Sequence, residues 1–159
     1  MEYLKISIGI FIALAASRLI PHPPNFTSLI ALSFYVPAIM GRKFIPAVMI
    51  SFFLTDIVIG FHSVTFFTWG SVAIIGILSK YFKKSIISRI SGAFSGAIIF
   101  FIITNLGVWI LGSYGHTFNG LLTCYTLALP FFGNSLVSTI ICSFAIEMIL
   151  KMKIVKSKV

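Results

Sequence analysis

Long apolar runs, separated by short polar segments, dominate this chain. Of its 159 residues, 58% are hydrophobic and only 9% are charged, whereas a soluble domain carries about 25% charged residues. So few charges cannot cover a surface that faces water, which indicates a lipid bilayer as the surrounding solvent. Because a straight crossing takes about 20 helical residues, the runs predict one all-α transmembrane domain over residues 1–159, a six-helix bundle with spans at approximately 3–20, 26–40, 44–61, 64–79, 90–111 and 131–150.

The basic residues predict how these six spans are oriented. Eleven of the twelve Lys and Arg residues fall at the chain ends or in the second and fourth connections, and Arg18 alone falls on the other side. Lys and Arg beside membrane helices accumulate on the cytoplasmic side, so both termini are expected in the cytoplasm. Short basic clusters between apolar runs are typical of contacts with membrane lipids, and no nucleic acid is expected as a partner. The eleven are Lys5, Arg42, Lys43, Lys80, Lys83, Lys84, Arg89, Lys151, Lys153, Lys156 and Lys158.

Two opposite charges are expected at a similar depth below the outer surface. Asp56 lies about five residues, or roughly 8 Å, from the outer end of the third span, and Arg18 occupies a comparable depth on the first. A carboxylate inside a membrane is costly and normally has a partner or faces a cavity. The two residues are therefore expected either to pair and tie two helices together or to bind a polar ligand, and these roles are compatible.

The three histidines all fall on the predicted outer side. His22 lies in a Pro-His-Pro-Pro run, whose prolines favour an extended, low-entropy loop that presents His22 and Asn25 over the mouth of the bundle. His62 ends the third span, and His116 lies in the third outer loop. Neutral imidazoles suit transition metals, but no pair has the spacing of a local metal site, so no metal ligands are assigned.

Amide and aromatic side chains near the outer ends of the last two spans predict a small-molecule pocket. Asn105 and Trp109 are four residues apart and share a helix face. Asn134 begins the sixth span, with Tyr125 shortly before it. The stretch 121–130 is expected to extend the sixth helix or to form a short interfacial helix, with a break at Pro130. An aromatic, amide-lined pocket is the usual composition of a ligand site, and interhelical hydrogen bonding is the alternative.

Small residues at helical spacing allow helices to approach closely. One stripe on the first span, Gly9, Ala13 and Ser17, is either internal packing or a docking face for a partner membrane protein. A second stripe, on the fifth span, predicts internal packing and consists of Ser88, Gly92 and Gly96.

No catalytic constellation is present in the sequence. There is no nucleophile–base pair with supporting spacing, no His-Glu-x-x-His and no phosphate-binding glycine loop, so neither an enzyme nor a bound cofactor is expected. Glu147 precedes Lys151 by four residues, which predicts a structural ion pair at the cytoplasmic end.

Four motifs of the chain resemble those of a family of small bacterial membrane proteins described as transport proteins. They are Arg-x-x-Pro-His-Pro-Pro-Asn over 18–25, Asp56 followed by Gly-Phe-His over 60–62, Thr-Asn-Leu-Gly-Val-Trp over 104–109 and Pro-Phe-Phe-Gly-Asn over 130–134. The resemblance covers nearly the whole chain. It implies a bacterial cytoplasmic (inner) membrane protein whose substrate-binding residues are Arg18, His22, Asn25, Asp56, His62, Asn105, Trp109 and Asn134.

That family is similar to the S components of energy-coupling factor (ECF) transporters in size, helix number and topology. The similarity implies a six-helix subunit that binds its substrate from outside and docks onto a transmembrane coupling protein driven by ATPases. In S components the first helix often carries an Ala-x-x-x-Ala docking motif, and here the matching positions are Gly9, Ala13 and Ser17.

The function expected from these observations is the binding and uptake of a small vitamin-like nutrient, such as a corrinoid or another cofactor precursor. The alternatives are a structural or assembly protein with a polar outer rim, a membrane enzyme that uses His22, His62 and Asp56, and a metal-ion uptake protein.

Overall fold

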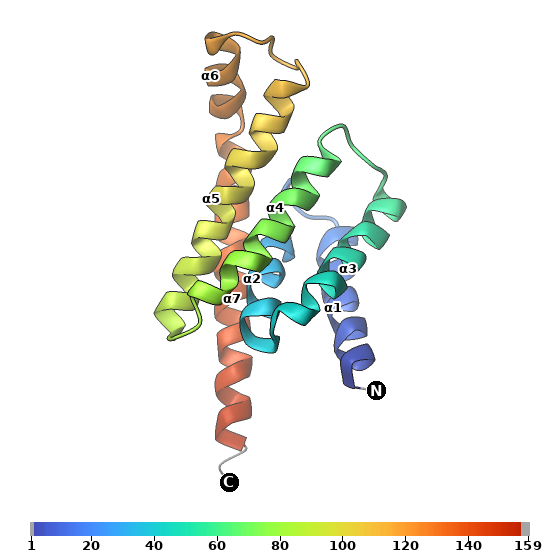
Figure 1. The fold of residues 1–159 in the computed structure, drawn as a ribbon, viewed down its shortest axis with the longest axis vertical. Coiled ribbons are helices and arrows are strands. Elements are labelled where there is room, and N and C mark those ends of the chain that lie inside the picture. Colours follow the sequence, from blue (N-terminus) through green and yellow to red (C-terminus); the bar gives the residue numbers. More distant parts are fainter. Residues whose placement is uncertain (1, 157–159) are drawn as a thin grey trace.

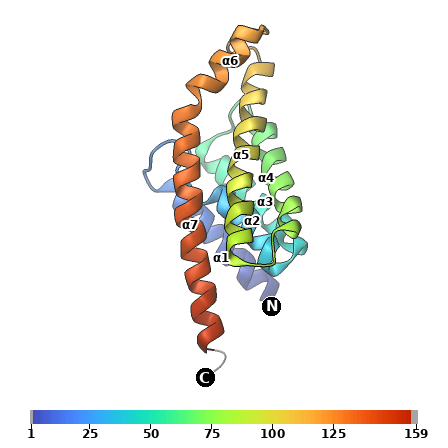
Figure 2. The same cartoon turned by 90° about the vertical axis from the view of Figure 1, so that its left-hand side faces the viewer.

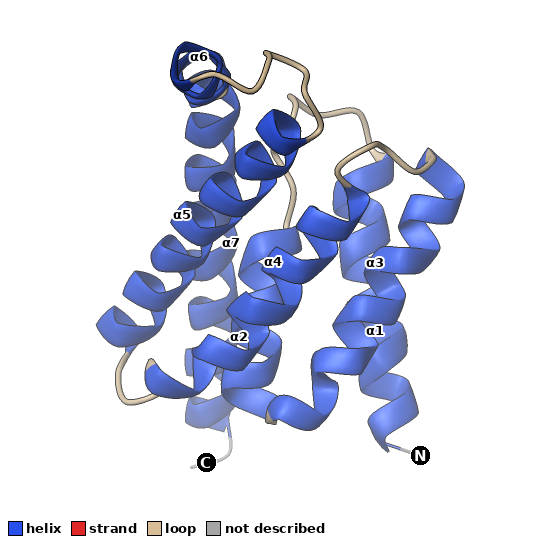
Figure 3. Ribbon diagram, turned by 45° about the horizontal axis from the view of Figure 1, so that its top comes forward, coloured by secondary structure: helices blue, strands red, loops and turns tan. Residues whose placement is uncertain are grey.

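A computed structural model describes residues 2–156, with side chains described to residue 152, and this part of the chain is all-helical without a strand (Figures 1 and 3). Seven α-helices and two short 3₁₀ helices follow one another: α1 Glu2–Leu19, α2 Leu29–Met40, η1 Arg42–Phe44, α3 Ile45–Ile59, α4 Thr65–Leu78, η2 Ser79–Tyr81, α5 Ile86–Ile110, α6 Phe118–Leu127 and α7 Leu129–Lys156. The six predicted apolar runs correspond to α1 to α5 and α7.

From α1 to α5 successive helices run in opposite directions, whereas α6 and α7 both run downward in Figure 1. The α5–α6 connection lies at the top of the molecule, and the α1–α2 and α3–α4 connections lie below it, at the upper ends of helices α1 to α4. The connections α2–α3 and α4–α5 lie at the lower end, together with the start of α1 and the end of α7. The chain therefore carries its histidine-containing connections at one end and its basic clusters at the other.

Local sequence signals set several helix ends. The Ser85 hydroxyl caps α5 by accepting from the Ser88 amide at 3.1 Å, and the Thr117 hydroxyl caps α6 by accepting from the Gly120 amide at 3.0 Å. These caps satisfy amides that the first helical turn leaves without partners. At the end of α3, Gly60 has φ +103°, a conformation that glycine adopts without steric cost.

Two forms were expected for the stretch 121–130, and the structure has the short separate helix. The helix α6 does not continue into α7 as one helix. The break falls at Ala128, two residues before Pro130. Pro130 is the second residue of α7, where proline is tolerated because the amide it lacks has no helical acceptor. The helix α6 packs against α5 and α7 at the upper end of the molecule (Figure 2).

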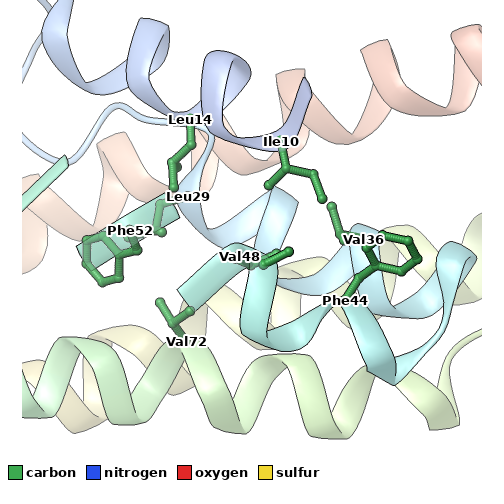
Figure 4. Packing of buried hydrophobic residues seen from close by; sticks show 9 residues of the cluster. Ile10, Leu14, Leu29, Val36, Phe44, Val48, Phe52 and Val72 are labelled. Carbon is green, nitrogen blue, oxygen red and sulfur yellow. The ribbon is translucent and has the colours of Figure 1, made fainter. Parts of the chain in front are cut away.

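The central helix is α2, which packs against α1, α3, α4, α5 and α7. One apolar cluster joins the four helices α1, α2, α3 and α4 around Leu14, Leu29, Val48 and Val72 (Figure 4). A second cluster joins α2, α4 and α5 around Phe34. Inside a bilayer lipid tails are as apolar as leucine, so close van der Waals packing and internal polar contacts hold such helices together.

The small-residue stripe of α5 packs internally, as predicted. Gly92 lies directly against α2, where a Cβ atom would come within 2.4 Å of the Phe34 ring. The stripe of α1 has a different environment. Gly9 and Ala13 are exposed, and a Cβ atom on Gly9 would meet nothing within 4 Å. Only Ser17 of this stripe packs internally, since its hydroxyl lies 2.7 Å from the Ser28 hydroxyl.

Two of the described helices are long and apolar enough to cross a membrane, namely Ile86–Ile110 and the segment Leu129–Met152 of α7. They pack against each other (Figure 2). Only 22% and 28% of their most apolar windows are buried inside the protein. A core helix of a soluble protein would be mostly buried, so this exposure favours a membrane location. The helices α2, α3 and α4, with 12, 15 and 14 residues, are each shorter than a straight crossing.

Candidate functional site

A cavity of about 410 Å³ opens between the α1–α2 connection and helices α3, α4, α5 and α7. It brings together five of the eight predicted substrate-binding residues: Arg18, His22, Asn25, His62 and Asn105. The sequence alone did not identify the rest of the lining. It includes the hydroxyl-bearing residues Thr27, Thr68, Thr104 and Ser135 and the rings of Phe52, Phe100, Phe101, Phe131 and Phe132.

Arg18 and Asp56 form an ion pair between α1 and α3. Arg18 Nη2 lies 2.7 Å from Asp56 Oδ1, with side-chain exposures of 12% and 2%. No N–H is aligned with this oxygen, so the contact is ionic and lacks the directionality of a hydrogen bond. Arg18 lines the cavity, whereas Asp56 does not. The carboxylate therefore neutralises and positions the guanidinium from behind.

Three further groups hold this pair. The Trp69 indole N–H donates to Asp56 Oδ2 at 2.7 Å, and Arg18 Nη1 donates to the Thr55 hydroxyl. The guanidinium carbon also lies 4.5 Å from the centroid of the Phe52 ring, a cation–π contact. Trp69 and Thr55 are not among the residues predicted from the sequence. Thr55 could have been identified from its position next to Asp56. Trp69 could not, because the direction of its side chain depends on how α4 is rotated about its axis.

The Pro-rich connection folds over the cavity as a defined turn. The Phe26 amide donates to the Pro23 carbonyl at 3.0 Å, and Asn25 adopts φ +62°. Asparagine tolerates this left-handed conformation better than most residues. The two ring nitrogens of His22 lie 2.7 Å from the Pro23 carbonyl and 3.3 Å from the Arg18 carbonyl. A neutral imidazole can donate to one of them.

Asn134 stabilises this connection from outside the cavity. Its side-chain N–H donates to the Pro24 carbonyl at 3.0 Å, which joins α7 to the Pro-rich turn. Asn134 is not among the cavity-lining residues. Through this hydrogen bond Asn134 helps to position the turn that carries His22 and Asn25 at the cavity rim.

His62 lies in the α3–α4 connection, where Thr65 holds it. The Thr65 hydroxyl donates to the His62 carbonyl at 2.7 Å, accepts from the His62 amide at 3.0 Å and lies 3.1 Å from its Nδ1 atom. These local contacts fix the turn that starts α4. His62 is exposed and lies at the cavity wall.

Asn105 and Trp109 share a helix face but have different surroundings. Asn105 lines the cavity, and its side-chain N–H donates to the Phe101 carbonyl at 2.8 Å within α5. Trp109 lies one turn further along α5 and outside the cavity lining, and its indole donates to the Thr117 carbonyl at 3.2 Å. The Trp109 ring also packs edge-on against His116, with centroids 6.0 Å apart. Trp109 therefore contacts the α5–α6 connection instead of stacking over the cavity.

The described residues contain no cluster of three or more His, Cys, Asp or Glu side chains that could hold a metal ion. His22 and His62 line the same cavity. His116 lies outside it beside Trp109, and its Nε2 atom lies 2.9 Å from the Ile110 carbonyl, which is not part of the cavity lining. The cavity thus offers a cation, amides, hydroxyls and aromatic walls. Such a set can bind a small polar molecule by hydrogen bonds and ring contacts.

Fold and cavity together define a protein that is all-helical over its described residues and has a cavity of mixed polar and aromatic lining near its histidine-bearing connections. Residues 2–158 match the model of a family of unknown function, DUF6580, and the chain belongs to this family. Comparison with curated proteins and with solved structures finds no match.

Proposed function

We propose that this protein is a substrate-binding membrane subunit that takes up a small vitamin-like nutrient. The observation that carries the proposal is the convergence of Arg18, His22, Asn25, His62 and Asn105 on one cavity. Five polar residues from four separate segments are arranged around a cavity that hydroxyl-bearing, aliphatic and phenylalanine side chains also line. The cavity volume of about 410 Å³ falls within the range of small-molecule sites, roughly 300–1,000 Å³.

The lining favours a ligand with an acceptor or anionic group and a flat apolar part. Arg18 supplies a guanidinium at the cavity, and Asp56 behind it reduces the net charge that a ligand meets. The Phe101 and Phe132 rings, stacked with centroids 4.5 Å apart, form an apolar wall. The volume lies near the lower end for ligand sites. A compact vitamin or precursor therefore suits the cavity better than a whole corrinoid.

The proposed arrangement in the membrane is a bundle of six spans, α1 to α5 and α7, with α6 at the outer interface. The 3₁₀ turns η1 and η2 lengthen α3 and α4 to roughly 28 and 27 Å, close to the hydrocarbon thickness of about 30 Å. α2 is the exception, since its 12 residues reach only roughly 18 Å. It lies at the centre of the bundle and packs against α1, α3, α4, α5 and α7. The basic clusters at the lower end support an orientation with both termini in the cytoplasm.

We propose that the protein works like an ECF S component, with a coupling protein as its partner. The face of α1 that carries Gly9 and Ala13 is exposed and unfilled. Small residues on an open helix face allow another membrane helix to pack closely. This feature supports docking through α1 and would leave the cavity open at the outer end during binding.

A structural role is the second candidate, and one observation favours it. Within the described residues, Arg18 and Asp56 already contact each other and have polar contacts to Thr55 and Trp69. A network with these internal contacts can stabilise a bundle without any ligand.

The identity of the small molecules that co-purify with the detergent-solubilised protein distinguishes the two proposed functions. Mass spectrometry is applied to the wild type, to His62→Ala and to the matched variant His116→Ala, whose histidine is on the same side but outside the cavity. A nutrient-binding subunit retains one compound in the wild type and in His116→Ala and loses it in His62→Ala. A structural protein yields the same lipid and detergent species in all three samples.

A further inference from the structure

A line of buried hydroxyl groups runs along one face of α7 and ends at a carboxylate. Ser135, Thr139, Ser143 and Glu147 follow one another at four-residue spacing, and all four are buried. Residues four apart on a helix lie above one another on the same face. The line therefore extends over three turns through the interior of the bundle, although α7 is one of the two helices apolar enough to cross a membrane.

The hydroxyls in the middle of this line make no well-formed hydrogen bond. Thr139 Oγ1, Ser143 Oγ and the neighbouring Tyr35 hydroxyl on α2 are buried without one within the described residues, although Ser143 and Glu147 lie beside the Tyr35 hydroxyl. Each of these residues is only 1% exposed. Other buried hydroxyls behave differently, since Ser33 and Ser51 donate to carbonyls of their own helices at 2.6 and 2.7 Å.

The line connects two functional ends. Ser135 lines the cavity described above. Glu147 forms a two-pronged ion pair with Arg89 of α5, in which Nε and Nη2 donate to the two carboxylate oxygens at 2.6 Å each. This finding corrects the expected pairing of Glu147 with Lys151, because the buried carboxylate faces α5 rather than the exposed side of its own helix.

The surroundings of Glu147 contain few other ionisable groups. Arg89 approaches from α5 and Tyr35 from α2, where Ser143 and Glu147 both lie beside its hydroxyl. Lys151 follows one turn later on α7 and is exposed. Arg89 Nη1 also donates to the Lys83 carbonyl at 3.3 Å, and the Arg89 side chain is 19% exposed. The guanidinium therefore reaches the basic end of the molecule while Glu147 stays inside.

The spacing of the hydroxyls is within reach of short chains of bridging water molecules. Residues four apart rise about 6.0 Å along a helix, whereas two hydrogen bonds of about 2.8 Å span at most about 5.6 Å. One or two waters between successive hydroxyls would supply the partners that these groups lack. Buried polar groups are normally satisfied in this way. Hydroxyls and waters that each donate and accept can pass a proton from one to the next.

We propose that this line is a proton route between the cavity and Glu147. A proton enters at Ser135, moves along the hydroxyl–water chain as each oxygen accepts one proton and releases another, and binds to the Glu147 carboxylate. Protonation neutralises Glu147 and releases Arg89 toward the basic end, after which the proton leaves to that side and the ion pair re-forms. No oxidant, reductant or other co-reactant is required, and the protein returns to its starting state.

The route is tested in proteoliposomes of the full chain that contain a pH-sensitive dye. An acidic pulse is applied outside while potassium and valinomycin clamp the membrane potential, with no nutrient present. The wild type is expected to acidify the interior faster than protein-free vesicles. Thr139→Val combined with Ser143→Ala removes two hydroxyls, keeps the Arg89–Glu147 pair intact, and is expected to slow acidification severalfold. Glu147→Gln is expected to slow it as well.

The matched control is Ser138→Ala. Ser138 is equally buried on α7, but its hydroxyl already donates to the Ser135 carbonyl at 3.1 Å and lies off the four-residue line. Its removal should leave the proton flux unchanged. Wild-type vesicles that acidify no faster than empty ones would overturn the proposal, and so would equal rates in Ser138→Ala and the double variant. Because no nutrient is used, either result is independent of whether the cavity binds one.

Discussion

The Trp69 indole donates a 2.7 Å hydrogen bond to Asp56 Oδ2, and Arg18 lies 2.7 Å from the other oxygen of the same carboxylate. Three helices, α1, α3 and α4, therefore meet at one buried acid. The acid lies behind the cavity and holds the Arg18 guanidinium at the cavity wall in place. The stability of the bundle and the composition of the cavity are thus linked through Asp56.

Replacement of Asp56 by Asn is expected to destabilise the protein strongly. The guanidinium of Arg18 would keep its charge, at 12% side-chain exposure, without a counter-ion. Removing one partner of a buried ion pair costs about 3–5 kcal/mol. Trp69→Phe removes only one hydrogen bond to a charged group, about 1.5–3 kcal/mol. Thermal unfolding in detergent should therefore rank the wild type above Trp69→Phe and Trp69→Phe above Asp56→Asn. Equal melting temperatures for wild type and Asp56→Asn would show that the pair contributes nothing.

Two glycine substitutions should have opposite effects. Gly92→Ala places a methyl group within 2.4 Å of the Phe34 ring, and overpacking of this kind costs about 1–3 kcal/mol. Gly9→Ala meets no atom within 4 Å and improves helix propensity by up to about 1 kcal/mol. The comparison uses the same melting experiment. A Gly92→Ala protein as stable as the wild type would contradict the close contact of α5 with α2.

The proposed six-span arrangement is tested by labelling single cysteines from outside the cell. Ser113→Cys lies in the exposed α5–α6 connection and Lys84→Cys in the exposed α4–α5 connection. Both are made in a background without Cys124 and Cys142. A membrane-impermeant maleimide should label Ser113→Cys in intact cells and Lys84→Cys only after permeabilisation. The reverse pattern would invert the orientation, and labelling of both positions in intact cells would rule out the alternating spans.

The native thiol of Cys124 is expected to react slowly with maleimide at neutral pH. Burial raises the pKa of this thiol, and the thiolate is the reactive form. Because the pKa is raised in the folded protein, a smaller fraction is thiolate at any given pH than in the unfolded chain. Labelling of a Cys142→Ser variant should therefore require a more alkaline pH when the protein is folded than when it is denatured. Identical pH profiles for the two states would contradict the buried position of Cys124 in α6.

The sequence was sufficient to predict which segments form the main helices. Apolar runs bounded by basic clusters or by Gly and Pro correspond to α1 to α5 and α7, because hydropathy and helix-breaking residues act locally. The separate helix α6 was only one of two expected forms. Its N-terminal cap at Thr117 is a local signal, but the break at Ala128 depends on how α6 packs against α5.

The candidate site was less predictable, because it depends on the rotation of each helix about its axis. The depth of Arg18 and Asp56 correctly suggested a pair. The shared face of Asn105 and Trp109 did not bring both to the cavity, since one helical turn carries Trp109 up to the α5–α6 connection. The cavity hydroxyls of Thr68, Thr104 and Ser135 lie within apolar runs, where serine and threonine are common and carry no distinctive spacing.

The most direct test of the outward ligand site is the melting temperature of purified protein with and without added compounds. The panel consists of vitamins, their precursors, corrinoids and divalent metal ions. A ligand at 100 times its Kd stabilises the folded state by about 2.7 kcal/mol. One compact nutrient is expected to raise the melting temperature of the wild type and of His116→Ala, and to raise that of His62→Ala much less. The account is contradicted if no compound in the panel stabilises the wild type, or if one stabilises all three proteins equally.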